Sequence, residues 1–281
     1  MERITSEKDL IETQRKKERS FSEVFKTKAL PYVGILALLG VWEISVRILD
    51  LPSYLLPAPT EIITVMIKNI QNIFDQSMVT AYEMIIGYFL AIAIAVPMAI
   101  GITASPSFDR FITPILLFFQ TVPKISLAPL FLVWFGVGIL PKILVAFLIS
   151  FFPIIIDTAV GLRSISPDMI DLARSMGASK MQIFTRFRLP TSLPYLFSGL
   201  KVASTLAVVG AVVGEFVGAD KGLGYLLLVA NSNLLTALMF GTIFALTVQG
   251  LILFYIIQVL ESWLIPWHIT VRSGQQEHGT M

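Results

Sequence analysis

The sequence predicts an all-α membrane protein that crosses the bilayer about six times. Hydrophobic residues make up 55% of the 281 residues and charged residues only 14%, against about 25% charged in an ordinary soluble domain. A surface with so few charges must face something apolar. In addition, six segments are long and apolar enough, or nearly so, to cross the ~30 Å hydrocarbon layer, which takes ~20 residues of helix.

The six predicted spans follow one another along the chain, and prolines interrupt the third. They cover residues 30–49, 78–103, 111–140, 142–160, 195–217 and 238–263. Residues 1–29 carry eight Lys or Arg and six Asp or Glu without an apolar run, which indicates a polar tail and not a signal peptide. We expect residues 78–264 to form the core of the molecule and residues 265–281 a C-terminal tail.

Two further segments contain apolar residues but are not expected to span. In the loop 50–77, Pro59 followed by Thr60 is typical of a helix start. The helix after it is expected to be amphipathic and to lie at the interface. In the segment 219–236 the apolar stretch 225–230 is too short to cross. It is either a re-entrant piece covered by protein or an interfacial helix.

Lys and Arg are distributed unevenly between the two sides of the predicted membrane. Cytoplasmic loops of membrane proteins carry an excess of these residues. With the N-terminus inside, the cytoplasmic side receives fifteen of them and the outer side four. The four are Arg47, Lys68, Lys142 and Lys221. Both termini are therefore expected in the cytoplasm, with the loop 50–77 outside.

Composition also excludes several kinds of active site. Cysteine is absent, so disulfides, cysteine-ligated zinc and thiol nucleophiles are excluded. The two histidines, His268 and His278, lie close to the end of the chain, and no metal site is expected. The sequence contains no Gly-x4-Gly-Lys-Ser/Thr phosphate loop, so ATP hydrolysis is not expected in this chain. We expect no catalytic residues and no cofactor of its own.

The cytoplasmic loop 161–194 is the most informative part of the sequence. Ser166, Pro167 and Asp168 have the order of an N-cap, a first-turn proline and an acid favoured by the helix dipole. An apolar stripe at helical spacing follows at Met169, Leu172, Ala173 and Met176. Gly177 is expected to end this helix.

A second short helix is predicted directly after the glycine. Ser179 is the expected cap, and Pro190 and Pro194 are expected to end the helix. Its apolar side chains are Met181, Ile183, Phe184 and Phe187. Two short amphipathic helices joined at a glycine suit docking into a groove of a soluble partner.

A motif in this loop resembles the permease subunits of ABC importers. Their cytoplasmic motif reads Glu-Ala-Ala, three residues, Gly, nine residues, Ile, any residue, Leu-Pro. At that spacing this chain has Ala173, Gly177, Leu189 and Pro190. It departs by Asp171 in place of Glu, and also by Leu for the first Ala and Phe for Ile.

The resemblance covers roughly residues 75–265 and favours the sulfonate, taurine and nitrate branch, through stretches 121–136, 214–216 and 264–268. It implies the type I importer permease fold in the inner or plasma membrane of a prokaryote. The partners it implies are a cytoplasmic ATPase dimer holding ATP-Mg, a second permease copy in a homodimer, an external binding protein and lipid, with no nucleic acid. The coupling residues it implies are Asp171, Ala173, Gly177, Ala178, Leu189 and Pro190.

Several polar or small residues within the spans are candidates for the translocation path. They are Gln120, Lys124, Gly210, Gly214 and Glu215. Lys124 either lines the path and attracts an anionic solute, or lies near the cytoplasmic surface with its ammonium group in water. The glycines have close helix packing as their alternative role. Glu215 is either a gate or part of a structural ion pair.

The arginines of the cytoplasmic loop are interpreted as a topology signal, with a nucleotide site as the alternative. The expected function is an importer permease for a small, anionic solute such as a sulfonate, nitrate, an aromatic acid or a vitamin precursor. The alternatives are an ion-coupled secondary transporter or a channel, which would need paired ionisable groups in the membrane, and a membrane enzyme. The substrate itself cannot be read from this sequence.

Overall fold

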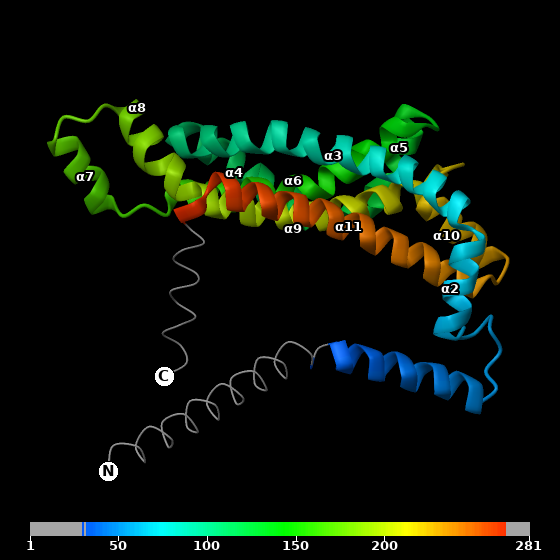
Figure 1. Ribbon diagram of the computed structural model, residues 1–281. Coiled ribbons are helices and arrows are strands. Elements are labelled where there is room, and N and C mark those ends of the chain that lie inside the picture. Colours follow the sequence, from blue (N-terminus) through cyan, green and yellow to red (C-terminus); the bar gives the residue numbers. More distant parts are fainter. Residues whose placement is uncertain (1–29, 31, 268–281) are drawn as a thin grey trace, which may run out of the picture.

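The computed structural model describes Leu30 and residues 32–267, and the regular structure in this part of the chain is helical, with no strand. The polar tail 1–29 and most of the tail 265–281 lie outside the described residues. After a first helix at residues 32–48, the elements follow in one order (Figure 1). They are α2 (Pro59–Lys68), α3 (Ile70–Ala104), α4 (Pro106–Thr121), a 3-10 turn (Lys124–Leu127), α5 (Ala128–Phe135), α6 (Ile139–Arg163), α7 (Pro167–Ser175), α8 (Lys180–Ile183), a π turn (Phe184–Arg188), α9 (Leu189–Gly218), α10 (Leu223–Ser232) and α11 (Thr236–Leu264).

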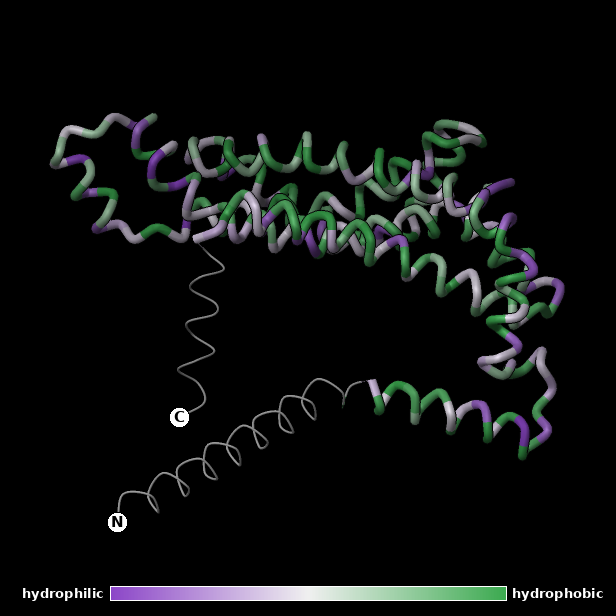
Figure 2. Tube along the Cα trace, viewed as in Figure 1, coloured by the Kyte–Doolittle hydropathy of each residue, from purple (hydrophilic) through white to green (hydrophobic). Residues whose placement is uncertain are grey.

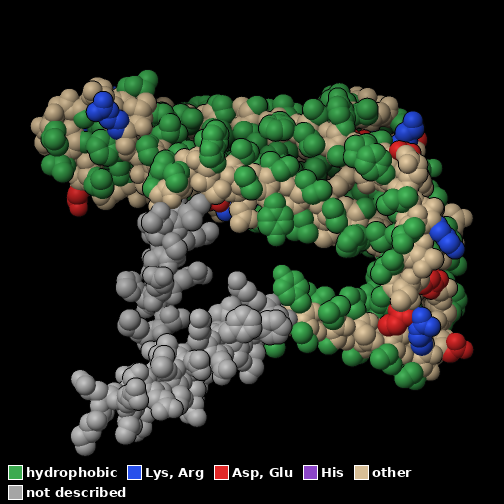
Figure 3. Space-filling model, in the orientation of Figure 1, with side chains coloured by type: hydrophobic (Ala, Val, Ile, Leu, Met, Phe, Trp, Pro, Cys, Tyr) green, Lys and Arg blue, Asp and Glu red, His purple; other side chains and the backbone are tan. Residues whose placement is uncertain are grey.

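Most of the predicted spans appear as long apolar helices. Four helices of the described chain are long and apolar enough to cross a membrane: α3, α6, α9 together with α8, and α11. The pair formed by α4 and the segment 124–135 passes the same test but bends by 89°, so the third span is broken as its prolines predict. The helix at 32–48 would complete six spans. Apolar residues follow the long helices in Figure 2 and cover most of the visible face in Figure 3.

The helices differ from the sequence prediction mainly at their ends. A helix is present where the sequence predicts one after Pro59, as α2. The next helix, α3, begins at Ile70, eight residues before the predicted Met78. Its first two turns carry Gln71, Asp75 and Gln76, so α3 is polar where it leaves the apolar layer. Charged and polar side chains do not prevent a helix from continuing, although they lower its mean hydropathy. The hydropathy of the sequence therefore located the span but not the start of the helix.

The core of the bundle is formed by α3, α6 and α9, which pack along one another. On α3 the alanines Ala91, Ala95 and Ala99 are fully buried at a spacing of four residues, and they form one small-residue stripe. Tyr88 of α3 donates a hydrogen bond to the carbonyl of Leu200 at 3.0 Å. Small residues let helix backbones approach closely where the surrounding lipid provides no hydrophobic drive between helices.

Two groups of elements mark the two ends of the bundle. Figure 1 shows α7 and α8 projecting beyond one end, whereas α2, α5 and α10 lie at the other. The helix α10 packs against α3, α9 and α11, with Leu223, Leu226 and Ala230 buried. The ambiguous segment 219–236 is thus a short helix packed on protein. The end that carries α7 and α8 is the one predicted to face the cytoplasm, and we refer to the opposite end as the outer end.

Candidate functional site: the α7–α8 loop and the buried polar groups of the bundle

The first short helix of the loop forms as the sequence predicts. The Ser166 hydroxyl accepts a hydrogen bond from the backbone N–H of Met169, and Pro167 occupies the first turn of α7. The helix ends at Ser175, and Gly177 adopts a φ of +82°. The N–H groups that follow this end bond back to carbonyls of its last turn, from Gly177 to Arg174 and from Ala178 to Ala173. This pair of bonds is the Schellman motif.

The second short helix begins as predicted but does not end as predicted. Ser179 and Gln182 form a reciprocal capping box at the start of α8. After one turn of α8 and a π turn, the backbone continues into α9 without a break. The expected end at Pro190 and Pro194 is wrong. Pro190 lies in the first turn of α9, directly after the π turn, and Pro194 lies inside α9. A proline has no N–H to donate, so it is tolerated best where the regular helical hydrogen-bond pattern is interrupted.

The predicted coupling residues lie at different depths in this loop. Asp171 is exposed and pairs with Arg174 at 3.2 Å. Ala173 is buried, and so is Ile183 of α8, whereas Ala178 is half-buried between them in sequence. Leu189 and Pro190 are half-buried at the start of α9. Of the predicted coupling residues, Ala173 is therefore the buried one, whereas Asp171 and Gly177 are exposed.

The loop also carries large apolar side chains on its surface. Leu172 is 63% exposed, Met176 81% and Met181 69%. Asp168, Arg174 and Lys180 are interspersed among them. Charged groups at this density are too costly to bury in hydrocarbon, and large apolar side chains in water mark a contact surface. We call Met169, Leu172, Met176 and Met181 the apolar edge of the loop.

The base of the loop is fastened to the bundle by arginines. Arg163 pairs with Asp109 of α4 at 2.9 Å, and Arg188 donates to the carbonyl of Thr103 at 3.4 Å. Together with the pair of Arg174 and Asp171, these bonds give three of the loop arginines partners within the chain. These bonds support a structural role, and the same three arginines also line a cavity of about 410 Å³ at the base of the loop.

Lys124 lies far from the loop. The pair of Arg163 and Asp109 places the first turn of α4 at the loop end of the bundle, and Lys124 follows the opposite end of that helix. Its ammonium group donates to the carbonyl of Gln120 at 2.9 Å and lies 4.6 Å above the ring of Phe152. Lys124 thus lies beside the middle part of α6, next to the break in the third span. Gln120 lines a cavity of about 200 Å³ between α4 and α6.

The two glycines proposed for the path lie inside a helix contact instead. A Cβ on Gly210 would stand 2.5 Å from the Cα of Ala146, and one on Gly214 would stand 2.7 Å from the Cα of Lys142. Both distances are far below ordinary contact. In this chain the glycines permit the approach of α6 to α9, so we assign them to packing and not to the path.

Glu215 is also buried, in a polar cluster at the outer end. It accepts hydrogen bonds from the hydroxyl of Thr80 at 2.7 Å and from the N–H of Gly224 in the first turn of α10. Beside it, Lys142 pairs with Glu83 at 2.9 Å, and both side chains are almost fully covered. Glu215 therefore fastens α10 to the bundle and does not line an open space in this structure.

The pairing of Glu83 with Lys142 is a feature that the sequence analysis missed. Lys142 was counted among the residues of an outer loop, but α6 begins at Ile139 and buries it. A second ion pair, Lys201 with Glu261 at 2.7 Å, joins α9 to α11 and was likewise not predicted. The available signal was the isolation of each charge within an apolar run, since such charges are costly unless they are paired.

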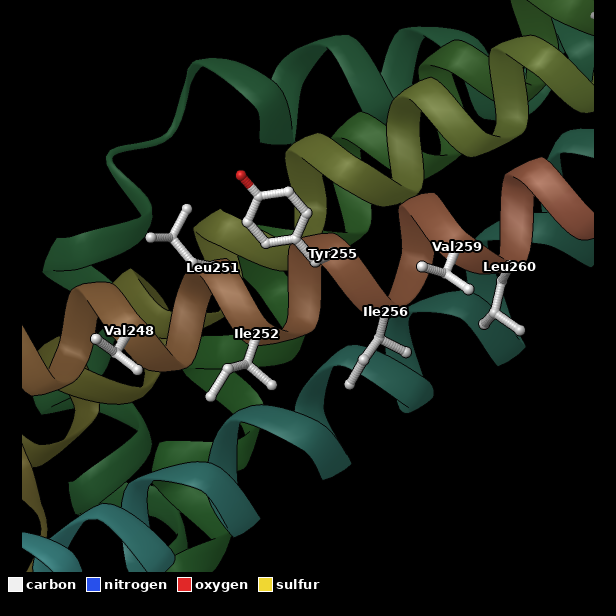
Figure 4. A pocket seen from close by; sticks show the side chains of 7 residues that line it. All are labelled: Val248, Leu251, Ile252, Tyr255, Ile256, Val259 and Leu260. Carbon is white, nitrogen blue, oxygen red and sulfur yellow. The ribbon is translucent and has the colours of Figure 1, made fainter. Parts of the chain in front are cut away.

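A depression along α11 is an unsuitable site for a polar solute. It runs along α11, and its lining side chains project from that helix (Figure 4). Leu251, Ile252 and Val259 are typical of the lining, to which only Tyr255 contributes a polar atom. Among the described residues, no group of three or more His, Cys, Asp or Glu could hold a metal ion.

Comparisons with known proteins agree with the helical organisation. The chain is 37% identical to the formylaminopyrimidine transport permease protein ThiX of Halalkalibacterium halodurans, over 84% of this chain and 95% of that protein. It is 32% identical to the riboflavin transport system permease protein RibX of Chloroflexus aurantiacus, over 84% and 88% of the two chains. It is 27% identical to the taurine transport system permease protein TauC of Escherichia coli, over 85% and 90%.

A solved structure shares the fold. It is described as an inward-facing conformation of the MetNI methionine ABC transporter, and the matched chain superimposes with a TM-score of 0.56 at 21% identity, over 71% of this chain and 97% of that one. The sequence of residues 87–267 matches the family described as "Binding-protein-dependent transport system inner membrane component". That match contains the α7–α8 loop and the path candidates from Gln120 to Glu215, whereas Glu83 lies just before it. The chain therefore belongs to this family of transport permeases, with the fold of a type I ABC importer permease.

Proposed function

We propose that this permease imports a small solute and is driven by a separate ATPase that docks on the α7–α8 loop. The observation that carries the proposal is the apolar edge of the loop. It projects beyond the bundle, is interspersed with charges that exclude it from hydrocarbon, and has no cover within the described chain. A helix with exposed apolar side chains at positions 169, 172 and 176 is suited to a groove on a soluble protein.

The test is a charge placed on the apolar edge. Leu172→Asp puts a carboxylate where the partner's groove is expected to be apolar, so the ATPase should no longer co-purify and ATP-driven uptake should fall to background. The amount of permease in the membrane should stay unchanged, because Leu172 makes few contacts within the chain.

The matched control is Ser175→Asp, which adds the same charge to the polar side of α7, beside Asp171. It should leave most of the co-purification intact. If Leu172→Asp retained the ATPase and full uptake, the docking surface would have to lie elsewhere. Uptake by vesicles that depended on an ion gradient and not on ATP would instead favour the alternative of a secondary transporter.

The path for the solute is proposed at the break between α4 and α5. Gln120 is exposed there, and Lys124 supplies a cation beside a broken helix. Broken backbone at membrane depth is tolerated where protein covers it or where it lines a water-filled cavity. The wide exposed face of α4 and α5 leaves room for a second copy of the chain, and we propose a homodimer with the path between the two copies.

The proposed substrate class follows from the relatives. The two relatives named above at 32% identity or more are named for formylaminopyrimidine and riboflavin, and the taurine relative is less similar. We therefore propose a small heteroaromatic vitamin precursor, delivered from outside by a binding protein. A small sulfonate is the second candidate, favoured by the cation of Lys124. Uptake of both classes by the same reconstituted transporter, with its binding protein, would distinguish them.

A further inference from the structure

Two carboxyl groups face each other in the polar cluster at the outer end of the bundle. Glu83 of α3 and Glu215 of α9 lie within hydrogen-bonding reach of one another. Both side chains are fully covered, at 0% exposure. Two oxygen atoms that both carry negative charge repel each other, so close contact between carboxyl groups in a dry site normally requires that one of them be protonated.

The hydrogen bonds of the cluster leave one oxygen without a donor. Both oxygens of Glu215 are occupied, by the Thr80 hydroxyl and the Gly224 N–H. One oxygen of Glu83, Oε1, accepts from the ammonium group of Lys142. The other, Oε2, is buried and has no hydrogen-bond partner. Buried polar atoms are rarely left unpaired in folded proteins, so this oxygen needs an explanation.

The charges of the cluster are also unbalanced if both acids are ionised. Lys142 is the cation that faces the two carboxyl groups, from α6. Thr80 on α3 and the start of α10 contribute neutral donors only. Two carboxylates with one ammonium would leave a net negative charge in a covered site, and an unbalanced buried charge is strongly destabilising. One added proton makes the cluster neutral.

We propose that the cluster is a buried proton-binding site, in which Glu83 carries a proton on Oε2 and donates it to a carboxylate oxygen of Glu215. This single proton pairs the orphan oxygen, removes the repulsion and balances the charge of Lys142. It also leaves Glu215 ionised, as its position against the first turn of α10 favours, since a helix N-terminus attracts negative charge.

A metal cation does not fit the same site. Hard cations such as Mg²⁺ and Ca²⁺ take about six or more oxygen ligands. Here Thr80 Oγ1 already donates to Glu215 and accepts from the N–H of Leu223 at 2.8 Å, so Glu83 Oε2 is the one side-chain oxygen of Thr80, Glu83 and Glu215 without a partner. A proton needs only the contact between two oxygens that the structure provides.

As a consequence, one proton holds the helices at the outer end together. Glu215 holds the start of α10, and Glu83 holds α6 through Lys142, so the proton joins the two halves of the cluster across α3 and α9. The close approach depends on Gly222 and Gly224, where an added Cβ would collide with the Glu215 carboxyl group. Loss of the proton would put two negative charges in contact and release α10.

The direct test compares the infrared spectra of the wild-type transporter and its variants, each reconstituted in lipid nanodiscs with its partner subunits. At neutral pH the wild type should show the carbonyl stretch of a protonated, buried carboxyl group, shifted in deuterated buffer. That band should disappear from the spectrum of Glu83→Gln. It should also disappear in Glu215→Gln, because Glu83 then ionises to balance Lys142. The control Glu261→Gln, at the charge-balanced pair with Lys201, should leave the band unchanged.

A stability measurement separates the proton from an ordinary ion pair. Glu83→Gln imitates the protonated acid, since its amide can donate to Glu215 and its carbonyl can accept from Lys142, so its melting temperature should stay close to that of the wild type. In Glu215→Gln an amide N–H faces one of the two donors, the Thr80 hydroxyl or the Gly224 N–H, so the melting temperature of this variant should be clearly lower. A wild type without the band, a band that survives in Glu83→Gln, or a Glu83→Gln variant that melts as low as Glu215→Gln would overturn the proposal.

Discussion

At the scale of single residues, Gly177 is the position where the backbone demands a particular amino acid. Its φ of +82° lies in the left-handed region, and an added Cβ would meet no atom within 4 Å. The requirement is therefore conformational and not steric packing. Ala in this region costs about 1 kcal/mol relative to Gly, and Asn tolerates the conformation better because its short polar side chain can bond locally.

Gly177→Ala should therefore weaken the joint between α7 and α8. We expect reduced ATP-driven uptake with a normal amount of permease in the membrane, measured as transport per molecule in vesicles. Gly177→Asn is the matched variant and should retain more transport than Gly177→Ala. Equal activity of Gly177→Ala and wild type would show that the left-handed turn is not needed for coupling.

Lys124 tests the proposed path at the same scale. Lys124→Met keeps most of the aliphatic stem but removes the ammonium group that lies at the break in the third span. For an anionic solute we expect uptake to fall on the order of tenfold, equivalent to about 1.4 kcal/mol, with a smaller loss in Lys124→Arg. Initial uptake rates at saturating binding protein are the measurement. Unchanged rates in Lys124→Met would remove this residue from the path.

At the scale of helices, the contact between α6 and α9 depends on residues without side-chain bulk. Gly210→Ala places a Cβ 2.5 Å from the backbone of Ala146, which forces the two helices apart. Overpacking of this kind costs about 1–3 kcal/mol. We expect a lower melting temperature in detergent or nanodiscs.

The same substitution at another buried glycine is the control. Gly250→Ala on α11 would bring a Cβ to 3.4 Å from Val208, an ordinary contact, and it should be neutral or slightly stabilising. A Gly210→Ala variant as stable as Gly250→Ala would mean that α6 and α9 can separate at little cost, contrary to the packing role assigned here.

At the scale of helices, the sequence predicted only some of the helix starts and ends. The start of α7 was predictable because Ser166, Pro167 and Asp168 act through bonds within one turn. The continuation of α8 into α9 was not predictable. A proline such as Pro190 usually ends a regular helix, but here it follows a π turn that the neighbouring residues do not predict. The break at Lys124 was predictable from its prolines, whereas its distance from the α7–α8 loop required the pair of Arg163 and Asp109.

At the scale of the whole molecule, the orientation in the membrane remains a prediction from the distribution of Lys and Arg. The absence of cysteine from the sequence allows a direct test with single introduced thiols. Ser175→Cys at the end of α7 should react with a membrane-impermeant maleimide only after cells are opened. Asn233→Cys, exposed after α10 at the other end of the bundle, should react in intact cells.

The reverse labelling pattern would place the α7–α8 loop outside, where no ATPase could reach it. The proposed docking function would then be lost, but the proton site would not, since its evidence lies in contacts among α3, α6, α9 and α10. The labelling result therefore tests the docking proposal and leaves the proton-site proposal untouched.

The sequence by itself determined which segments are apolar enough to cross, where the first loop helix begins and which family the coupling motif resembles. These properties are local, because hydropathy, capping and motif spacing act among residues close along the chain. Only the tertiary structure decided which buried charges meet, as for Glu83 with Lys142 or Glu215 with Thr80. Those partners lie 59 and 135 residues apart, and their meeting depends on the rotation and register of whole helices, which packing sets and a linear pattern does not record.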